Sequence, residues 1–492
     1  MMNTTPEWIA RSVSRLRPGP AVGKAPASKA ALDKTVTDVV PKEAAQRSTH
    51  ERLQAMLRRG NEALSPRALR RLLADLQEVV AAQVSEIEGG RRAQVVAEWY
   101  AKAEPEERRD MWLLMCEQFA PDASRFKSAR QRYEAAAGTA EEGQAEISLR
   151  RALVSPRTRL LQRFAVFPQG MRFLVDLRAE LLPQLKSDKR LLPLDAELEQ
   201  LFGTWFDVAF LQLKRLSWDS PASLLEKLIK YEAVHDIKSW ADLKNRLDSD
   251  RRCYGFFHPR LPDEPLIFVE VALLDKMSAS ITPLLDESAA PVDISRASTA
   301  IFYSISNTQA GLRGVSFGDS LIKHVVETLT DEFPRLRTFA TLSPIPGFRA
   351  WLAKRAGAML ERLDDKRRAE LGRAVGFEPP QATHLLAAID KPLDLDARSP
   401  LRQMLMECAA YYLGRELADG KPADPVARFH LGNGARVERL NWAGDPSPKG
   451  LKQSYGLMVN YLYDLKRIDK HRGLLAQGKV PMSGDIDSLC RD

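Results

Sequence analysis

Hydrophobic residues recur every three or four positions from residue 49 to residue 195, which is the spacing of one buried helix face. Ser65 and Pro66 form an N-cap and first-turn pair, and a stripe of leucines and valines follows from Leu69 to Val84, until Gly89 and Gly90. Further helices are predicted at 91–103, where Val95, Val96 and Trp99 share a stripe, and at 106–119, 123–137, 140–164 and 170–186. These stripes are either the core of a helical bundle or a surface for self-association.

The pattern changes after residue 195, where aromatic residues become frequent. Helices are predicted at 195–214, 221–230, 349–374 and 396–416. The apolar runs Leu266–Leu274 and Ala300–Phe302 predict strands. A hairpin is predicted from Val426–Leu431, a Gly432-Asn433-Gly434 turn and Arg436–Trp442. The sequence therefore predicts an α+β protein, with an all-helical bundle followed by a mixed α/β region.

Composition divides the chain further. Residues 1–48 are rich in Ala, Pro, Ser and Lys, which predicts a disordered or loosely attached tail. The predicted domains are therefore 1–48, 49–195 and 196–492. The tail holds eight basic and four acidic residues, so half of the net charge of +8 lies there. The rest is spread thinly, which argues against a nucleic-acid partner. No apolar run approaches the ~20 residues of a membrane span.

The cysteines predict neither a metal site nor a disulfide framework. Cys116, Cys253, Cys408 and Cys490 are isolated in the sequence and lack metal-ligand spacing. We expect reduced thiols, with Cys490 the most exposed, although disulfides between subunits stay open. His258 and His324 also fit no ligand set, so a structural role is favoured for both.

The segment 299–348 carries the clearest candidate for a binding site. A strand at Ala300–Phe302 is followed by a loop with Gly311, Gly314 and Gly318, and a helix begins near Asp319 or Ser320. Its apolar face is predicted to comprise Leu321, Ile322, Val325, Val326 and Leu329. A helix N-terminus behind a glycine-rich loop can hold a pyrophosphate, but such loops also occur simply to make a tight turn.

Three further residues could carry chemistry. His430 lies beside the predicted hairpin turn and could donate a proton near neutral pH, or pair with a backbone carbonyl. Ser343 precedes Pro344 on a stiff segment. It is either an active hydroxyl or a residue that forms a turn. Tyr463 is either a core aromatic or a neighbour of the same site.

Several long motifs occur in one order: SISNTQAGLRGVSFGDSLIK, FPRLRTFATLSPIPGF, DPVARFHLGNGARVERLNWAGD and GLMVNYLYDL. They resemble malonyl-CoA decarboxylases, and the resemblance extends from about Leu201 to Leu465. It implies a helical N-terminal domain, a catalytic domain of the GNAT acetyltransferase type, and a homo-oligomer, a tetramer or dimer formed through the helical domain.

The resemblance also implies site residues. His430 and Ser343 occupy the positions of the family's catalytic histidine and serine, and Tyr463 that of a tyrosine near the acyl group. Asp424 stands where Asn is commoner. The coenzyme A segment corresponds to Arg313, Gly314, Val315, Ser316, Phe317, Gly318 and Asp319. Ser316 replaces a frequent Glu, so only a hydroxyl or an N–H is available there for phosphate or thioester contact.

The implied reaction turns malonyl-CoA into acetyl-CoA and carbon dioxide through a thioester enolate, which a Ser343–His430 pair protonates. No metal or organic cofactor is expected, because the thioester is the electron sink. A coenzyme A-dependent acyltransferase and a non-catalytic helical scaffold are the alternatives. Animal members can be addressed to mitochondria, but Glu7 and the lack of an apolar leader segment favour a bacterial-style cytoplasmic protein.

Overall fold

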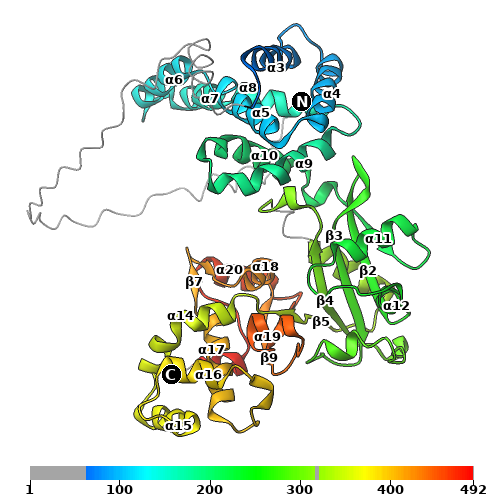
Figure 1. Ribbon diagram of the computed structural model, residues 1–492, viewed down its shortest axis with the longest axis vertical. Helices are drawn as coiled ribbons and strands as arrows, with labels where there is room; N and C mark the ends of the chain where they lie inside the picture. The colour runs from blue at the N-terminus through cyan, green and yellow to red at the C-terminus, as the bar shows by residue number, and fades with distance from the viewer. Residues whose placement is uncertain (1–62, 316–320, 491–492) are drawn as a thin grey trace, which may run out of the picture. The chain divides into compact units, whose positions relative to one another are not determined.

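The computed structural model describes residues 63–315 and 321–490, and these described residues belong to one structural unit. The predicted tail at 1–48 lies outside the described residues. The first part of the described chain is helical, coloured blue to green in Figure 1. Its α-helices are α3 (Pro66–Val79), α4 (Glu86–Lys102), α5 (Pro105–Gln118), α6 (Ala123–Ala136), α7 (Glu142–Leu153), α8 (Pro156–Phe164), α9 (Gly170–Leu181) and α10 (Leu192–Trp205). The short 3₁₀ helices η1 (Leu182–Lys186) and η2 (Lys189–Leu191) precede α10.

The helical prediction is confirmed, and side-chain capping explains the starts of four of these eight α-helices. Ser65, Ser85, Asp122 and Ser155 each accept a backbone N–H bond at the start of their helix. The α3 stripe is buried in a core shared with α4, α5, α8, α9 and α10. These residues therefore form bundle core. The predicted self-association through the helical region stays a prediction.

Three helix boundaries of this region were predicted wrongly, and in the second part the predicted helix 349–374 is two helices, Phe348–Glu361 and Asp365–Val375. Gly89 and Gly90 do not end a helix: α3 ends at Val79, and both glycines lie inside α4. They are needed there because a Cβ on Gly89 would lie 2.9 Å from the Val79 carbonyl oxygen, and one on Gly90 2.7 Å from Val166. The segment 140–164 is two helices, because Ser155 and Pro156 start α8. The segment 195–214 is also not one helix: α10 ends at Trp205, and a strand begins at Gln212.

Val95 was also assigned to the wrong face, since its side chain is 61% exposed. The buried residues of α4 include Ala93, Val96, Ala97 and Tyr100. They follow one another at intervals of three, one and three residues, which places them on the helix face toward the core.

The second part of the chain is built on one mixed sheet. Its strands are β1 (Gln212–Leu216), β2 (Arg251–His258), β3 (Leu261–Leu274), β4 (Thr299–Asn307), β5 (Thr338–Thr341), β6 (Ser343–Pro344), β9 (Arg436–Asn441) and β10 (Met458–Leu462). Their order is β1-β2-β3-β4-β5-β10-β6, and β9 pairs with β10. β4 and β5 pair in parallel, and the other pairs of this sheet are antiparallel. The strands predicted at 266–274 and 300–302 are confirmed, while β1, β2 and β10 were missed.

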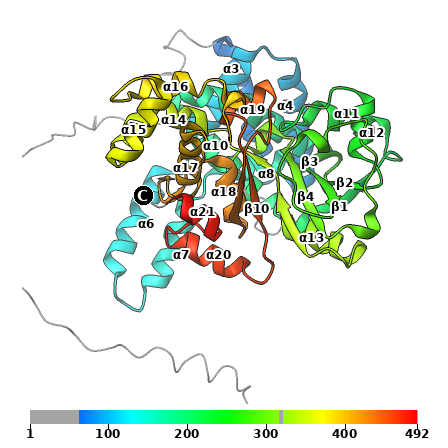
Figure 2. The ribbon, with the colours of Figure 1, turned by 90° about the horizontal axis from the view of Figure 1, so that it is seen from below.

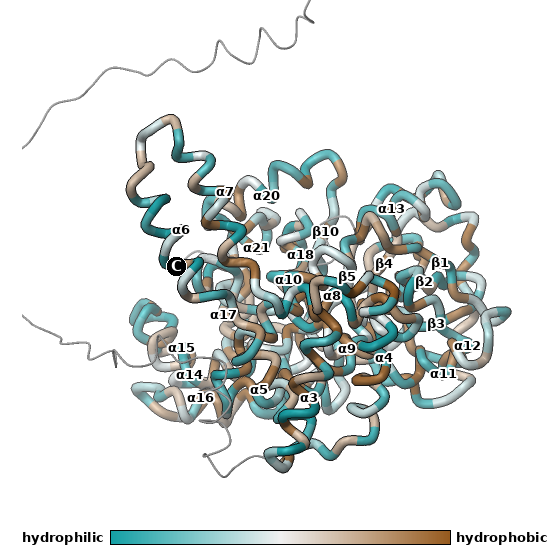
Figure 3. Tube along the Cα trace, turned by 90° about the horizontal axis from the view of Figure 1, so that it is seen from above, coloured by the Kyte–Doolittle hydropathy of each residue, from teal (hydrophilic) through white to brown (hydrophobic). Residues whose placement is uncertain are grey.

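Helices cover both faces of the sheet, as Figure 2 shows. α11 (Ala222–Tyr231) and α12 (Trp240–Arg246) pack on one face, and α13 (Leu321–Glu332) packs on the other. The central strands carry long hydrophobic stretches, brown in Figure 3. The predicted apolar face of α13 is buried as expected, but the predicted start of that helix lies outside the described residues.

Eight further α-helices belong to this part of the described chain, together with the short pair β7 (Leu417–Ala418) and β8 (Lys421–Pro422). They are α14 (Phe348–Glu361), α15 (Asp365–Val375), α16 (Ala382–Ala388), α17 (Pro400–Gly414), α18 (Pro425–Gly432), α19 (Pro448–Ser454), α20 (Ile468–Ala476) and α21 (Gly484–Leu489). A helical region followed by a mixed α/β region is therefore the observed fold. The finer assignment to the GNAT type and the domain limits at 48 and 195 stay predictions.

The predicted hairpin at 426–442 is wrong in its first arm. Residues Pro425–Gly432 form α18, and only Arg436–Asn441 is a strand, which pairs with β10. The Asp424 carboxylate accepts the backbone N–H groups of Val426 and Ala427, and Pro425 occupies the first helical turn. That capping favours a helix over the hairpin that the Gly-Asn-Gly sequence suggested.

Candidate active site

Ser343 lies two residues after the end of β5, and it is almost completely buried. It belongs to β6, where it pairs with Val459 of β10. Its hydroxyl donates to Thr341 Oγ1 over 2.8 Å, and its Oγ lies 3.3 Å from His430 Nε2. The serine and the histidine, 87 positions apart in the sequence, therefore meet in the fold.

His430 lies in the last turn of α18, and its imidazole contacts a serine and two tyrosines of the site. Nε2 faces Ser343, and Nδ1 lies 2.8 Å from the Tyr463 hydroxyl oxygen. Its ring stacks on Tyr461 at a centroid distance of 4.8 Å. Burial lowers the pKa of His430 to about 3, because the charged imidazolium would lose its hydration. His430 is therefore a neutral imidazole near pH 7.

Tyr463 follows β10, and its backbone N–H donates to the Phe339 carbonyl of β5 over 2.9 Å. Its buried hydroxyl has a pKa raised far above the usual range by desolvation, so it stays protonated. The structure brings Ser343, His430 and Tyr463 into one continuous hydrogen-bonded chain. Such a chain has the composition of an acid–base catalytic centre.

Asp424 connects the two motifs that carry Ser343 and His430. One carboxylate oxygen caps α18, and the other accepts the Gly347 N–H at 3.4 Å and the Tyr412 hydroxyl at 3.5 Å. Gly347 is the N-cap residue of α14, four residues after Ser343, and a Cβ there would lie 2.3 Å from the Tyr412 hydroxyl oxygen. Burial raises the pKa of Asp424. Asp424 thus holds α18 against the serine-bearing segment, a role that its N-cap position alone did not reveal.

Sequence reasoning missed Thr341 and Tyr461, which contact the site directly. Thr341 accepts from the Ser343 hydroxyl, and the Tyr461 N–H donates to the same threonine oxygen over 3.1 Å. Both residues lie two positions from a predicted site residue, on the same face of an extended strand. That period-two spacing was the available signal.

The predicted coenzyme A segment is described only in part. Arg313, Gly314 and Val315 line a cavity of about 820 Å³, together with Lys186 of η1 and the end of β4. Ser316, Phe317, Gly318 and Asp319 lie outside the described residues. The helical region therefore supplies one wall of the cavity beside this loop.

A buried arginine of the helical region holds the start of the loop. The Arg178 guanidinium donates to the carbonyls of Gly311 and Arg313, each over 2.9 Å, and pairs with Asp195 and Glu199. Its side chain is 1% exposed. Because the cation is paired on both sides, its burial is compensated, and α9 and the loop are joined by directed bonds.

We expect Gly311→Ala to destabilise the protein by about 1 to 3 kcal/mol, the usual range for forcing an atom into a packed contact. A Cβ at this position would lie 1.9 Å from the Val175 carbonyl oxygen of α9, so the loop and helix would have to separate. Urea unfolding measures the change. The matched control is Gly357→Ala in α14, which meets nothing within 4 Å and should stabilise by about 0.5 to 1 kcal/mol. Equal effects of the two substitutions would contradict the close contact.

A smaller cavity lies next to Tyr463. It has a volume of about 180 Å³ and is lined by Lys323 of α13, Asn433 and, from α20, Asp469 and Arg472. The phenol at the end of the hydrogen-bonded chain therefore borders a polar space, although Ser343 and His430 are themselves buried.

The residues that could suggest a metal site either have another role or are not grouped with other potential ligands. His258 Nδ1 accepts the Arg260 N–H over 3.1 Å, which supports the structural role predicted for it. Among residues 63–315 and 321–490, no three His, Cys, Asp or Glu side chains are grouped so as to hold a metal ion. That the reaction needs no cofactor stays a prediction.

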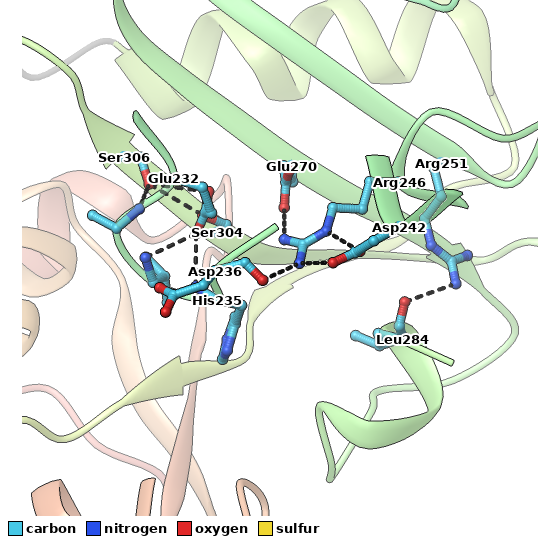
Figure 4. Close-up of polar contacts among 12 residues, drawn as sticks. Glu232, His235, Asp236, Asp242, Arg246, Arg251, Glu270, Leu284, Ser304 and Ser306 are labelled. Carbon is cyan, nitrogen blue, oxygen red and sulfur yellow. Dashed lines mark hydrogen bonds and ion pairs between the residues drawn. The ribbon is translucent and has the colours of Figure 1, made fainter. Parts of the chain in front are cut away.

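A second buried polar cluster lies on the α11–α12 face of the sheet (Figure 4). Arg246 pairs with Asp242 at 2.8 Å and with Glu270 at 3.1 Å, and Glu232 accepts from Ser304 and Ser306. Burial, with the nearby Glu232 charge, raises the pKa of Glu270 to about 8. Because the Arg246 guanidinium is bonded to both Asp242 and Glu270, we interpret this cluster as a structural connection between α12 and β3.

The four cysteines are free thiols, as predicted. Cys116, Cys253 and Cys408 are buried, and Cys490 is the most exposed of the four. Burial raises the pKa of Cys116 to about 11 and that of Cys408 to about 12, which makes both poor nucleophiles. In the described part of the chain, no helix is long and apolar enough to cross a bilayer.

Comparison with known proteins identifies the family. The model of the malonyl-CoA decarboxylase C-terminal domain matches residues 209–492, and that of the N-terminal domain matches residues 119–206. The mitochondrial malonyl-CoA decarboxylase of the goose Anser anser anser is 38% identical over 330 residues, which cover 64% of this chain and 66% of the goose protein. The chain therefore belongs to the malonyl-CoA decarboxylase family.

Solved structures agree with this assignment. The crystal structure of malonyl-CoA decarboxylase from Rhodopseudomonas palustris is 40% identical, with a TM-score of 0.73, and the match covers 85% of this chain and 99% of that one. The one from Cupriavidus metallidurans is 44% identical, with a TM-score of 0.69, and the match covers 86% and 100%. The family prediction is thus confirmed, while the roles of the individual site residues stay predictions.

Proposed function

We propose that this protein decarboxylates malonyl-CoA to acetyl-CoA and carbon dioxide. The observation that carries the proposal is the buried chain from Ser343 through His430 to Tyr463, formed by motifs of the family that the chain belongs to. Loss of carbon dioxide leaves a thioester enolate, which must be stabilised and then protonated at carbon. Donors aimed at the thioester oxygen are each worth about 3 kcal/mol in such a site.

The protonation states of His430 and Tyr463 determine the proposed route of the proton to the enolate. The neutral His430 holds no spare proton near pH 7, so it passes a proton on and does not store one. The Ser343 hydroxyl gives its proton to the enolate carbon and takes one from His430 Nε2. Nδ1 takes a proton from the Tyr463 hydroxyl, which is refilled from water in the cavity beside it. One proton from solvent is thus consumed for each carbon dioxide released.

In this proposal, coenzyme A binds in the cavity of about 820 Å³, and its phosphates lie near Lys186 and Arg313. Both side chains are cations, as phosphate recognition requires. The Arg178 bonds to the loop support the same placement, because they fix the backbone beside the cavity before the ligand arrives.

Lys186→Gln is expected to raise KM for malonyl-CoA about tenfold and to leave kcat nearly unchanged, because a charge-assisted bond to a remote phosphate is made equally in substrate and transition state. Steady-state kinetics measures both constants. Lys189→Gln is the matched control, since Lys189 is exposed on the neighbouring 3₁₀ helix but does not line the cavity. A lower kcat with unchanged KM would argue against phosphate binding at Lys186.

The proposed function is tested with purified full-length protein, malonyl-CoA, and neither metal nor amine added. We expect carbon dioxide and acetyl-CoA in equal amounts. A folded protein that binds coenzyme A but releases no carbon dioxide would contradict decarboxylation and favour acyl transfer to an acceptor. Gel filtration with light scattering tests the proposed homo-oligomer, and the proposed cytoplasmic location requires fractionation of the producing cell.

A further inference from the structure

Thr341 is a fully buried hydroxyl at the end of β5 with two bonds donated to it. It accepts from the Tyr461 backbone N–H over 3.1 Å and from the Ser343 hydroxyl over 2.8 Å. A hydroxyl oxygen has two lone pairs, so both are occupied by these donors. The Tyr461 N–H belongs to β10 and cannot turn away, which fixes the direction in which Thr341 receives Ser343.

This arrangement decides which nitrogen of His430 carries the proton. A serine hydroxyl has one hydrogen, and Ser343 gives it to Thr341 at the shorter of its two contacts. Toward His430, 3.3 Å away, Ser343 can therefore only accept, so Nε2 must be the protonated nitrogen. Nδ1 is then left to accept from the Tyr463 hydroxyl at 2.8 Å.

We propose that Thr341 is a positioning residue, which holds His430 in the tautomer protonated at Nε2. The inference rests on the proposed function for its catalytic meaning, because this is the tautomer that can refill Ser343 after it protonates the enolate. If Ser343 donated to His430 instead, the imidazole proton would lie on Nδ1 and point away from the reaction.

The surroundings hold Thr341 in place. Its carbonyl accepts the Asn460 side-chain amide over 2.6 Å, and Asn460 also accepts from Asn441. Stacking on Tyr461 prevents the His430 ring from turning out of the chain. The hydroxyl of Thr341 is therefore the element that can be removed without moving the imidazole.

The test compares Thr341→Val, which keeps the shape of the side chain without the hydroxyl, with Thr341→Ser, which keeps the hydroxyl. Nitrogen shifts of ¹⁵N-histidine-labelled full-length protein, measured by solid-state magnetic resonance, report the tautomer directly. His430→Gln identifies the His430 signals among the seven histidines. Thermal melting shows which variants are folded, and Thr341→Ala replaces the valine variant if that one is not.

We expect the Nε2-protonated form in the wild type and in Thr341→Ser, and a change to the Nδ1-protonated form in Thr341→Val. The kcat of the valine variant should fall at least about tenfold with KM nearly unchanged, since a wrong tautomer harms the chemical step. An Nδ1-protonated wild type, or a valine variant with unchanged signals, would overturn the inference. Expected signals in a protein that releases no carbon dioxide would overturn the proposed function and leave the tautomer assignment standing.

Discussion

Replacing His430 with glutamine is expected to lower kcat by about 10²- to 10⁴-fold, the usual contribution of a positioned acid–base group. Glutamine can keep a contact to Ser343 or Tyr463, but it cannot pass a proton between them. KM for malonyl-CoA should change little, because His430 is buried in the middle of the proton path and does not line the cavity assigned to coenzyme A.

Ser343→Ala should cause a loss of similar size, and the double variant should be little worse than either single one. Residues that act as one unit give such non-additive losses. His384→Gln is the control for replacing a histidine, because His384 lies on α16 and stacks on Phe377 instead. Losses that simply multiply in the double variant would mean that the serine and histidine act separately.

The second large effect expected is a loss of stability in acid that depends on His430. Its folded pKa of about 3 lies below the unfolded value near 6.5, so between these values the unfolded chain binds a proton that the folded protein does not. Stability is therefore complete above pH 6.5 and is lost as the pH falls toward 3. From pH 7.5 to pH 5, this group alone should remove about 2 kcal/mol from the free energy of unfolding.

Urea unfolding at pH 7.5 and pH 5 measures this loss in the wild type and in His430→Gln. The variant should lose about 2 kcal/mol less than the wild type, whatever its stability at pH 7.5. It should still lose some, because burial also lowers the pKa of His235, to about 4. Equal losses in the two proteins would mean that His430 is as easily protonated in the folded protein as in the unfolded chain.

Local patterns predicted most of the helical region but not where its helices join. The stripe from Leu69 to Val79 is buried as its spacing indicated. Gly89 and Gly90 were misinterpreted, because a glycine pair ends a helix in isolation but here admits the close approach of α3 and α8. The sequence within a window of a few residues does not contain that contact.

The residues of the site also divide into those that the sequence predicted and those that it did not. The family motifs predicted Ser343, His430 and Tyr463 as site residues, and the fold brings their side chains together. The contributions of Thr341, Tyr461 and Arg178 were not predicted. Arg178 donates to a loop carbonyl 133 positions away, and Thr341 accepts a backbone N–H 120 positions away. Period-two spacing marks Thr341 and Tyr461 as neighbours of site residues, but no local pattern marks the partner that each contacts.

The amino-acid sequence by itself determined the helical and mixed α/β regions, the family, and the residue types available for proton transfer. These depend on spacing, capping and motifs, which are local. Tertiary structure alone decided that residues 425–432 are a helix that presents His430 to Ser343, that α9 holds the loop at Gly311, and that Thr341 orders the hydrogen bonds of the site. A hydrogen bond needs a donor–acceptor distance of about 3 Å, held to within a few tenths of an ångström. Between segments far apart in the chain, only packing sets that distance.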